Sequence, residues 1–171
     1  MDKDAYVSAD GKYRYWLSRI WDRNVRPLAY IMLNPSTADA NKDDPTIRRC
    51  IGFAKRDGFG GILVLSLFAY RAAKPSELKN AYDRFGPEND YWIEKLLGGS
   101  RFDPSAPIVC AWGGHGYTYE DFDFKYNIPE HAKLMCFGVT KSLKPLHPLY
   151  LSNHRTLVPF NEYTQPEEEC A

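Results

Sequence analysis

The sequence predicts an α/β fold of three layers, α/β/α, in which helices cover both faces of a mainly parallel central sheet. Apolar runs of strand length recur along the chain, and segments with helical periodicity separate them. Most of these runs are apolar throughout, which is typical of strands that are buried on both faces. Strands that alternate with helices in this way usually pair in parallel.

Five strands are expected. The first, at residues 13–21, alternates polar and apolar side chains and is predicted to form an antiparallel edge. The other four are apolar and lie at residues 27–33, 61–68, 107–112 and 132–137.

Helices are expected between these strands. Asp44 is predicted to cap one of them, because Pro45 suits the first turn and Gly58 suits the end. The core-facing stripe of this helix has helical spacing and comprises Ile47, Cys50, Ile51 and Ala54. Two further helical segments are expected, at residues 74–78 and 86–97.

A chain of 171 residues has the length of one domain. We assign residues 1–171 to a single domain with its core at about 13–160, and we expect residues 164–171 to be disordered. The protein is predicted to be cytoplasmic and without membrane contact, because its N-terminus is polar and no apolar run has the length of a membrane span. It is also expected to be a monomer.

Charge and cysteine content limit the function classes. The 22 basic and 22 acidic residues give zero net charge, which argues against strong non-specific nucleic-acid binding over the whole surface. The four cysteines have no C-x-x-C spacing, so we expect no metal and no cofactor. Cys110 and Cys136 lie in apolar runs and are expected to be buried, reduced thiols.

The most informative position is the end of the second predicted strand, where an apolar run stops at Asn34 and Pro35. Proline has no N–H for the sheet and holds the preceding residue extended. Asn34 is therefore presented at the carboxyl end of a buried strand, where ligands bind in open α/β sheets. An ordinary Asn-Pro turn is the alternative interpretation.

Four short motifs occur in an order that resembles the uracil-DNA glycosylase superfamily. Residues 32–36, Met-Leu-Asn-Pro-Ser, resemble the first motif in its asparagine form, as in mismatch-specific and thymine-DNA glycosylases. Residues 63–75 resemble the middle motif, residues 108–113 a strand that ends in glycine, and residues 146–149 the final His-Pro motif. The chain is also similar to a bacterial and phage family of unassigned function with Leu-Asn-Pro-Ser and His-Pro-Leu-Tyr signatures.

The resemblance implies a monofunctional DNA glycosylase that flips a base out of DNA and hydrolyses its N-glycosidic bond. Asn34 would orient the attacking water, and His147 would donate a hydrogen bond to the departing base. The residues expected to contact the base are Leu33, Pro35, Ser36, Ser66 and Phe68. Those expected to contact DNA are Arg71, Lys74, Lys141, Lys144 and Pro148.

Each assignment has a structural alternative. Asn34 would be a turn-capping amide, His147 a loop residue before a proline, and Phe68 a core side chain. The cationic residues would be solvated loop charges. His115 is a weaker candidate and reads more simply as a surface residue.

Two positions depart from the enzymes that are strict for uracil. Ser66 stands near the position where those enzymes read the base edge with asparagine, and a hydroxyl cannot reproduce a bidentate amide contact. Ser36 replaces a bulky tyrosine, which leaves the C5 side of the base open. We therefore expect a 5-substituted or hypermodified pyrimidine, such as a modified cytosine of phage DNA, rather than plain uracil.

Two other functions remain open. One is a nucleic-acid-binding domain of the same fold without catalysis, and the other is a hydrolase of free nucleosides or nucleotides. A dinucleotide-binding enzyme is disfavoured, because no G-x-G-x-x-G follows a strand and no P-loop is present.

Overall fold

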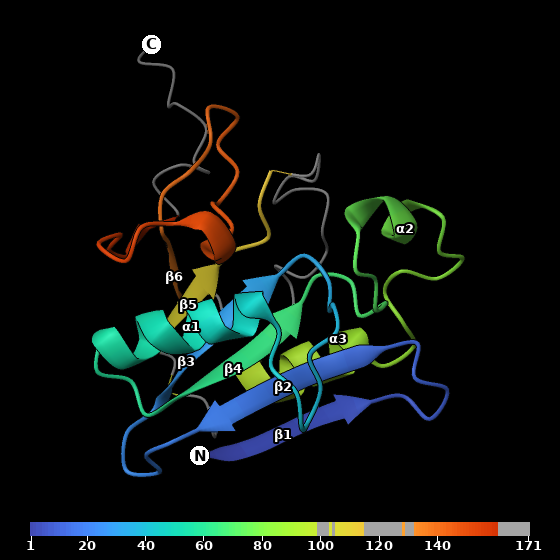
Figure 1. Ribbon diagram of the computed structural model, residues 1–171, viewed down its shortest axis with the longest axis horizontal. Helices are drawn as coiled ribbons and strands as arrows, with labels where there is room; N and C mark the ends of the chain where they lie inside the picture. Colours follow the sequence, from blue (N-terminus) through green and yellow to red (C-terminus); the bar gives the residue numbers. More distant parts are fainter. Residues whose placement is uncertain (99–102, 104, 115–127, 129–131, 161–171) are drawn as a thin grey trace.

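The computed structural model describes residues 1–98, 103, 105–114, 128 and 132–160. Within them lies one seven-stranded mixed sheet with the order β1-β2-β4-β3-β5-β6-β7 (Figure 1). The strands are β1 (Asp2–Val7), β2 (Arg14–Ile20), β3 (Pro27–Met32), β4 (Gly61–Ser66), β5 (Pro107–Cys110), β6 (Lys133–Cys136) and β7 (Val158–Pro159).

The centre of the sheet is parallel and its edges are antiparallel. Strands β4, β3, β5 and β6 run in the same direction, whereas β1 and β2 on one side and β7 on the other are antiparallel to their neighbours. Pro27 pairs with Gly61 and Met32 pairs with Ser66, so β3 and β4 begin and end level with each other. The segments that follow these two strands therefore start side by side.

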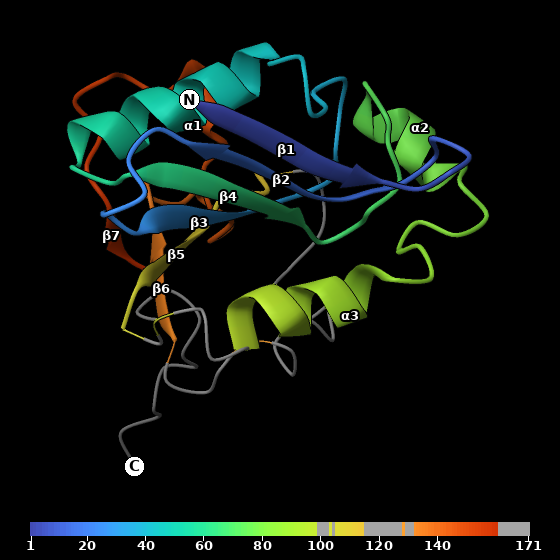
Figure 2. The ribbon, with the colours of Figure 1, turned by 90° about the horizontal axis from the view of Figure 1, so that it is seen from below.

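Helices lie on both faces of the sheet (Figure 2). Helix α1 (Pro45–Arg56) covers one face, and α3 (Asn89–Ile93) with the π-helical turn η1 (Glu94–Gly98) covers the other. The short α2 (Pro75–Lys79) and the 3-10 turn η4 (Pro148–Tyr150) lie in connecting segments. The predicted α/β class with a mainly parallel centre is confirmed.

The core is divided by β3, whose side chains alternate between the two faces. Leu28, Tyr30 and Met32 pack in the cluster beneath α1. Ala29 and Ile31 pack in the cluster beneath α3. All five side chains are buried, as predicted for a strand without polar alternation.

Helix α1 has the predicted cap and end. The Asp44 carboxylate accepts a hydrogen bond from the Ile47 N–H at 2.8 Å, and Pro45 occupies the first turn. The helix ends at Arg56, and Gly58 then takes a positive φ of 80°, which a residue with a Cβ disfavours. Ile47, Cys50 and Ala54 of the predicted stripe are buried together with Phe53, whereas Ile51 is only half-buried.

The expected edge strand is not at the edge. The predicted strand at 13–21 corresponds to β2, which pairs with β4 on one side and with β1 on the other. The sequence interpretation missed β1, because its polar residues resemble a solvated terminus. Polar and charged side chains are typical of edge strands, because they discourage pairing with another chain.

Several strand ends also differ from prediction. Strand β4 stops at Ser66, and β5 stops at Cys110, each two residues before the expected end. Leu67 and Phe68 still donate backbone hydrogen bonds to Met32 and Leu33, but the regular pairing with β2 ends at Val64, and Arg14 N–H then donates to the Ala69 carbonyl at 3.0 Å. The predicted disorder at 164–171 and the weak candidate His115 lie outside the described residues.

Cys50, Cys110 and Cys136 are buried free thiols, so the prediction for Cys110 and Cys136 is confirmed. Burial raises the pKa of the Cys110 thiol well above its ordinary value, and the nearby Cys136 adds to the effect. In the part of the chain that the structure describes, no helix has the length and apolar character to cross a membrane.

A buried arginine ties the sheet to the segment that leads into α1. Arg19 on β2 is fully buried, and its Nε donates to Asp43 at 2.7 Å. Its other nitrogens donate to backbone carbonyls, including those of Asp39 and Lys42. Asp43 also accepts from Lys3 at 2.9 Å. The loop before Asp44 is thereby fixed on the sheet.

We expect Asp43→Asn to lower the free energy of unfolding by roughly 3 kcal/mol at pH 7, because it leaves the Arg19 guanidinium buried without its counter-charge. Burial acts to raise the pKa of Asp43, but the hydrogen bonds from Lys3 and Arg19 outweigh it and the pKa is lowered. A lowered carboxyl pKa stabilises the fold above the unfolded pKa of about 4, and this stabilisation is lost as the pH falls through the folded pKa.

Urea unfolding of both proteins at pH 7 and near pH 2 measures this difference, which should shrink in acid. Asp90→Asn, at an exposed position in α3, is the control and should change stability by less than about 0.5 kcal/mol. Equal stability of wild type and Asp43→Asn at pH 7 would contradict the assignment.

Candidate functional site

A pocket of about 500 Å³ lies at the carboxyl end of β3, beside the N-terminus of α1. Its walls come from segments that are far apart in the sequence: residues 32–34 and 36–37, residues 44–47, residues 72–73, and residue 147 with 149–150. Further contributions come from β2, β4 and Trp112. This is the position expected for a ligand site, because the parallel strands β3, β4 and β5 all end here.

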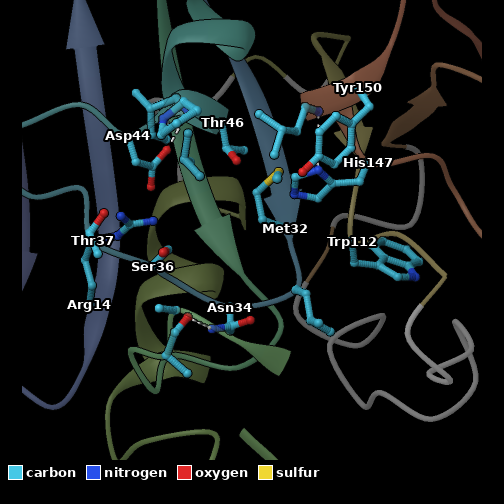
Figure 3. A pocket seen from close by; sticks show the side chains of 17 residues that line it. Arg14, Met32, Asn34, Ser36, Thr37, Asp44, Thr46, Trp112, His147 and Tyr150 are labelled. Carbon is cyan, nitrogen blue, oxygen red and sulfur yellow. Dashed lines mark hydrogen bonds between the residues drawn. The ribbon is translucent and has the colours of Figure 1, made fainter. Parts of the chain in front are cut away.

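The pocket brings together the two residues predicted to be catalytic. Asn34 and His147 both line it, as do Leu33 and Ser36. Figure 3 shows Arg14 and Asp44 on one side and His147 with Tyr150 on the other. Leu33 is almost fully buried, whereas Asn34, Ser36 and His147 are half-buried.

Two hydrogen bonds fix the orientation of the Asn34 amide. Its Nδ2 donates to the Pro35 carbonyl at 2.9 Å and to the Ala72 carbonyl at 3.0 Å. The Ala72 N–H in turn donates to the Pro35 carbonyl at 2.9 Å. Both donors of the amide are used, so Oδ1 is the atom that can accept a hydrogen bond from a ligand or a water molecule. Figure 3 shows the oxygen of the labelled Asn34 amide on the side opposite the dashed hydrogen bond of its nitrogen.

His147 precedes η4 and caps it. Its Nδ1 accepts a hydrogen bond from the Leu149 N–H at 3.3 Å. A nitrogen that accepts carries no proton, so in the neutral ring the proton lies on Nε2, which is then a donor. This tautomer can donate a hydrogen bond from Nε2 to an acceptor.

The segment before His147 is held against the sheet by backbone hydrogen bonds. After β6, the chain forms a turn in which Thr140 N–H donates to the Lys144 carbonyl at 2.8 Å. On its return, the Pro145 carbonyl accepts from Gly113 N–H at 3.0 Å, and Leu146 N–H donates to Gly138 at 2.9 Å. His147 is therefore placed by contacts with the ends of both β5 and β6.

The segment after His147 is held by α1, and Figure 1 shows the two side by side. Arg49 donates to the Asn153 side chain and to the Leu151 carbonyl. Arg56 donates to the carbonyl of Asn153 at 2.5 Å and to that of Arg155 at 2.7 Å. Since α1 also carries the opposite pocket wall at its N-terminus, one helix positions both sides of the pocket.

Three residues predicted to contact the base do not line the pocket. Ser66 is buried, with its carbonyl accepting from Asn89 at 3.0 Å. Phe68 is 2% exposed and packs in the cluster on the α3 face, 5.1 Å from the ring of Phe85. Pro35 is buried and contributes its carbonyl to the Asn34 contact. The structural alternative for Phe68 is thus correct, because β4 ends before Phe68 and turns it into the core.

The residues predicted to contact DNA also lie outside the pocket lining. Lys74 and Lys141 are exposed, and Lys144 is half-buried. Arg71 donates to the Gly11 carbonyl at 3.3 Å, which ties it to the loop between β1 and β2. Pro148 is buried in the first position of η4, which leaves its side chain little surface for the predicted contact with DNA.

Sequence reasoning missed a cation inside the pocket. Arg14, the first residue of β2, is only 3% exposed and lines the pocket. Its Nη1 donates to the Ala38 carbonyl at 2.9 Å, and its Nε has no hydrogen-bond partner among the described residues. Burial lowers the pKa of this guanidinium to about 10, although Asp44 acts in the opposite direction.

Other pocket residues were also overlooked as ligand contacts. Asp44 was assigned only as a helix cap, and Trp112 only as the last residue of a strand. An aromatic side chain at the carboxyl end of a parallel strand was the available signal for Trp112. Among the described residues, no cluster of three or more metal-ligating side chains occurs.

Comparison with known proteins places the chain in a sequence family. The family described as "Protein of unknown function (DUF1643)" matches residues 14–149, which include Arg14, Asn34 and His147. No curated protein and no solved structure matches the chain significantly.

We expect Asn34→Asp to destabilise the protein by about 2 kcal/mol at pH 8, because a carboxylate cannot donate to the Pro35 and Ala72 carbonyls that it would face. The loss should be smaller at pH 4, where the introduced carboxyl is more protonated and regains one donor. Thermal unfolding at the two pH values measures both effects. The control is Ser36→Ala, which removes a neighbouring pocket hydroxyl and should cost less than about 0.5 kcal/mol.

Proposed function

The chain belongs to the DUF1643 family, and we propose that its pocket hydrolyses the N-glycosidic bond of a pyrimidine nucleotide flipped out of DNA. The observation that carries the proposal is that Asn34 and His147 line one pocket, although they lie in distant parts of the sequence. The ordered motifs that resemble the uracil-DNA glycosylase superfamily support it, as does the placement of helices on both faces of a sheet with a parallel centre.

Cleavage of the glycosidic bond separates charge between the sugar and the base, and Asn34 and His147 are each suited to one of these two groups. As the bond breaks, positive charge develops on the sugar and negative charge on the base. Asn34 Oδ1 is held ready to accept a hydrogen bond from a water molecule, which would then attack the sugar. An amide is a poor base, so this contribution is positioning rather than proton abstraction.

His147 is suited to the departing base. With its proton on Nε2, the neutral ring can donate a hydrogen bond to a base oxygen and stabilise its developing charge. The half-buried setting strengthens such a bond, since water competes for it less than at the surface.

The pocket also supports a substituted base as substrate. Ser36 contributes a small side chain to the lining. The resemblance implies that it stands where uracil-specific enzymes have a tyrosine that excludes a 5-methyl group. The proposed substrate is therefore a 5-substituted or hypermodified pyrimidine, such as a modified cytosine of phage DNA, and the product is an abasic site.

A hydrolase of free nucleotides is the second candidate. It is favoured by the location of positive charge, because Arg14 lies inside the pocket while Lys74, Lys141 and Lys144 do not line it. Binding to DNA with a steep dependence on salt would favour the glycosylase instead.

The test of the proposal is excision from phage DNA that carries glycosylated hydroxymethylcytosine, with uracil-containing duplex in parallel. Abasic sites, detected by strand cleavage in alkali, should appear with the phage DNA. Asn34→Ala and His147→Ala should each reduce excision about a hundredfold or more. The matched controls are Asn80→Ala and His154→Ala, both at exposed positions outside the pocket lining, and they should retain full activity. Absence of abasic sites from both DNAs with folded protein would refute the proposal.

Substrate choice has a separate test at Ser36. A tyrosine at this position would fill the C5 side of the pocket, so Ser36→Tyr should lower excision of the modified base at least about tenfold relative to plain uracil. An unchanged ratio of the two rates would show that Ser36 does not face the C5 substituent.

A further inference from the structure

The Arg14 side chain is buried, lines the pocket and forms no ion pair among the described residues. Its guanidinium reaches the pocket beside Ser36 and Thr37, opposite the wall that carries His147 (Figure 3). Only 3% of the residue is exposed. No acidic side chain among the described residues forms an ion pair with it.

The two carboxylates that act on the charge of Arg14 each accept hydrogen bonds from backbone N–H groups. Asp44 accepts from the Ile47 N–H as the cap of α1. Asp39 accepts from the N–H groups of Asn41 and Lys42 at 2.8 and 2.9 Å. Both carboxylates lie close enough to raise the pKa of Arg14, but burial outweighs them. The positive charge of Arg14 is therefore only partly compensated.

The positive charge of Arg19, the other buried arginine of β2, is compensated more fully. Arg19 has an ion pair with Asp43 and further hydrogen bonds to four backbone carbonyls. Among the described residues, the Arg14 side chain has one hydrogen bond, to the Ala38 carbonyl, and its Nε has no partner. A buried charge without a partner costs free energy, so a site that holds one is matched to a ligand of opposite charge.

The surroundings of Arg14 specify the chemistry of that ligand. Ser36, Thr37 and Thr46 supply hydroxyl groups to the lining, and the N-terminus of α1 adds partial positive charge. A guanidinium offers several donors in a planar fork, which matches the oxygens of a phosphate. The pocket volume of about 500 Å³ lies within the range of about 300 to 1,000 Å³ that holds ligands of drug size, to which a mononucleotide belongs.

We propose that Arg14 binds a phosphate group of the nucleotide ligand, so that the sugar and base extend from there toward Asn34 and His147. This inference rests on the proposed function in taking a nucleotide as the ligand. It adds the means by which the pocket distinguishes a nucleotide from a nucleoside.

Asp44 supplies a sharp test of this assignment. Its carboxylate lies in the same lining and repels an anion, yet asparagine caps helices about as well as aspartate. Asp44→Asn should therefore keep α1 intact and tighten phosphate binding several-fold. If Arg14 and Asp44 instead recognised a neutral amide group together, the same substitution would weaken binding.

Calorimetric titration with deoxycytidine and with deoxycytidine 5′-monophosphate measures the contribution of the phosphate. Wild type should bind the monophosphate at least about tenfold more tightly than the nucleoside. Arg14→Met should abolish this preference, and Arg14→Lys should keep part of it, because the charge remains but the fork is lost. Arg23→Gln removes an exposed arginine outside the pocket and should keep the preference in full. Circular dichroism establishes that each variant is folded.

A trinucleotide d(TpCpT) without terminal phosphates distinguishes the two sources of phosphate. Binding that depends on Arg14 with this probe assigns the site to a phosphate within DNA, whereas such binding with the monophosphate alone assigns it to a free nucleotide. Either result supports the inference. It is overturned if Arg14→Met weakens the binding of neither the monophosphate nor the trinucleotide, or if none of the three probes binds to wild type. Excision is measured separately, so a failure of the glycosylase assay with intact Arg14-dependent binding would refute only the proposed function.

Discussion

The hydrogen bonds between the segments that follow β3 and β4 hold the rest of the site in place. The backbone N–H groups of Leu67 and Phe68 donate to the carbonyls of Met32 and Leu33. Further along, the Ala72 N–H and the Asn34 amide both donate to the Pro35 carbonyl, and the amide also donates to the Ala72 carbonyl. Because β3 and β4 end level with each other, these bonds form between neighbouring backbones. Proline is tolerated here since the sheet needs no further donor from it, and its carbonyl accepts twice. The direction of the Asn34 amide is a consequence of this arrangement.

Helix α1 links the two ends of the pocket. Its N-terminus, capped by Asp44, contributes one wall, and its arginines Arg49 and Arg56 hold the segment that follows His147. The cap is itself fixed to the sheet through Arg19 and Asp43. A change in the seating of this helix would therefore move both walls together. The proposed chemistry depends on such coupling, because a displacement of about 1 Å between reacting groups can cost a large part of the rate.

The two buried arginines of β2 illustrate how the same residue serves stability and binding. Arg19 is surrounded by acceptors and stabilises the loop before α1. Arg14 faces the pocket with fewer acceptors, and its pKa is lowered to about 10 because burial disfavours the charged form. A buried charge in the pocket makes the folded protein less stable than a neutral side chain would. In exchange, the pocket has a higher affinity for an anion.

The sequence by itself determined the local features: the apolar strands, the Asp44 cap, the helix end near Gly58, and the end of a buried strand just before Asn34 and Pro35. These follow from periodicity and from backbone preferences that act within a few residues. Only the tertiary structure decided that β1 forms the edge, that Phe68 turns into the core and that Arg14 enters the pocket. It also decided that His147 lies across the pocket from the α1 wall, and the candidate site could therefore be predicted only in part. Such placements depend on contacts between residues far apart in the chain, and no local pattern distinguishes an arginine that will be buried without a partner from one that water will surround.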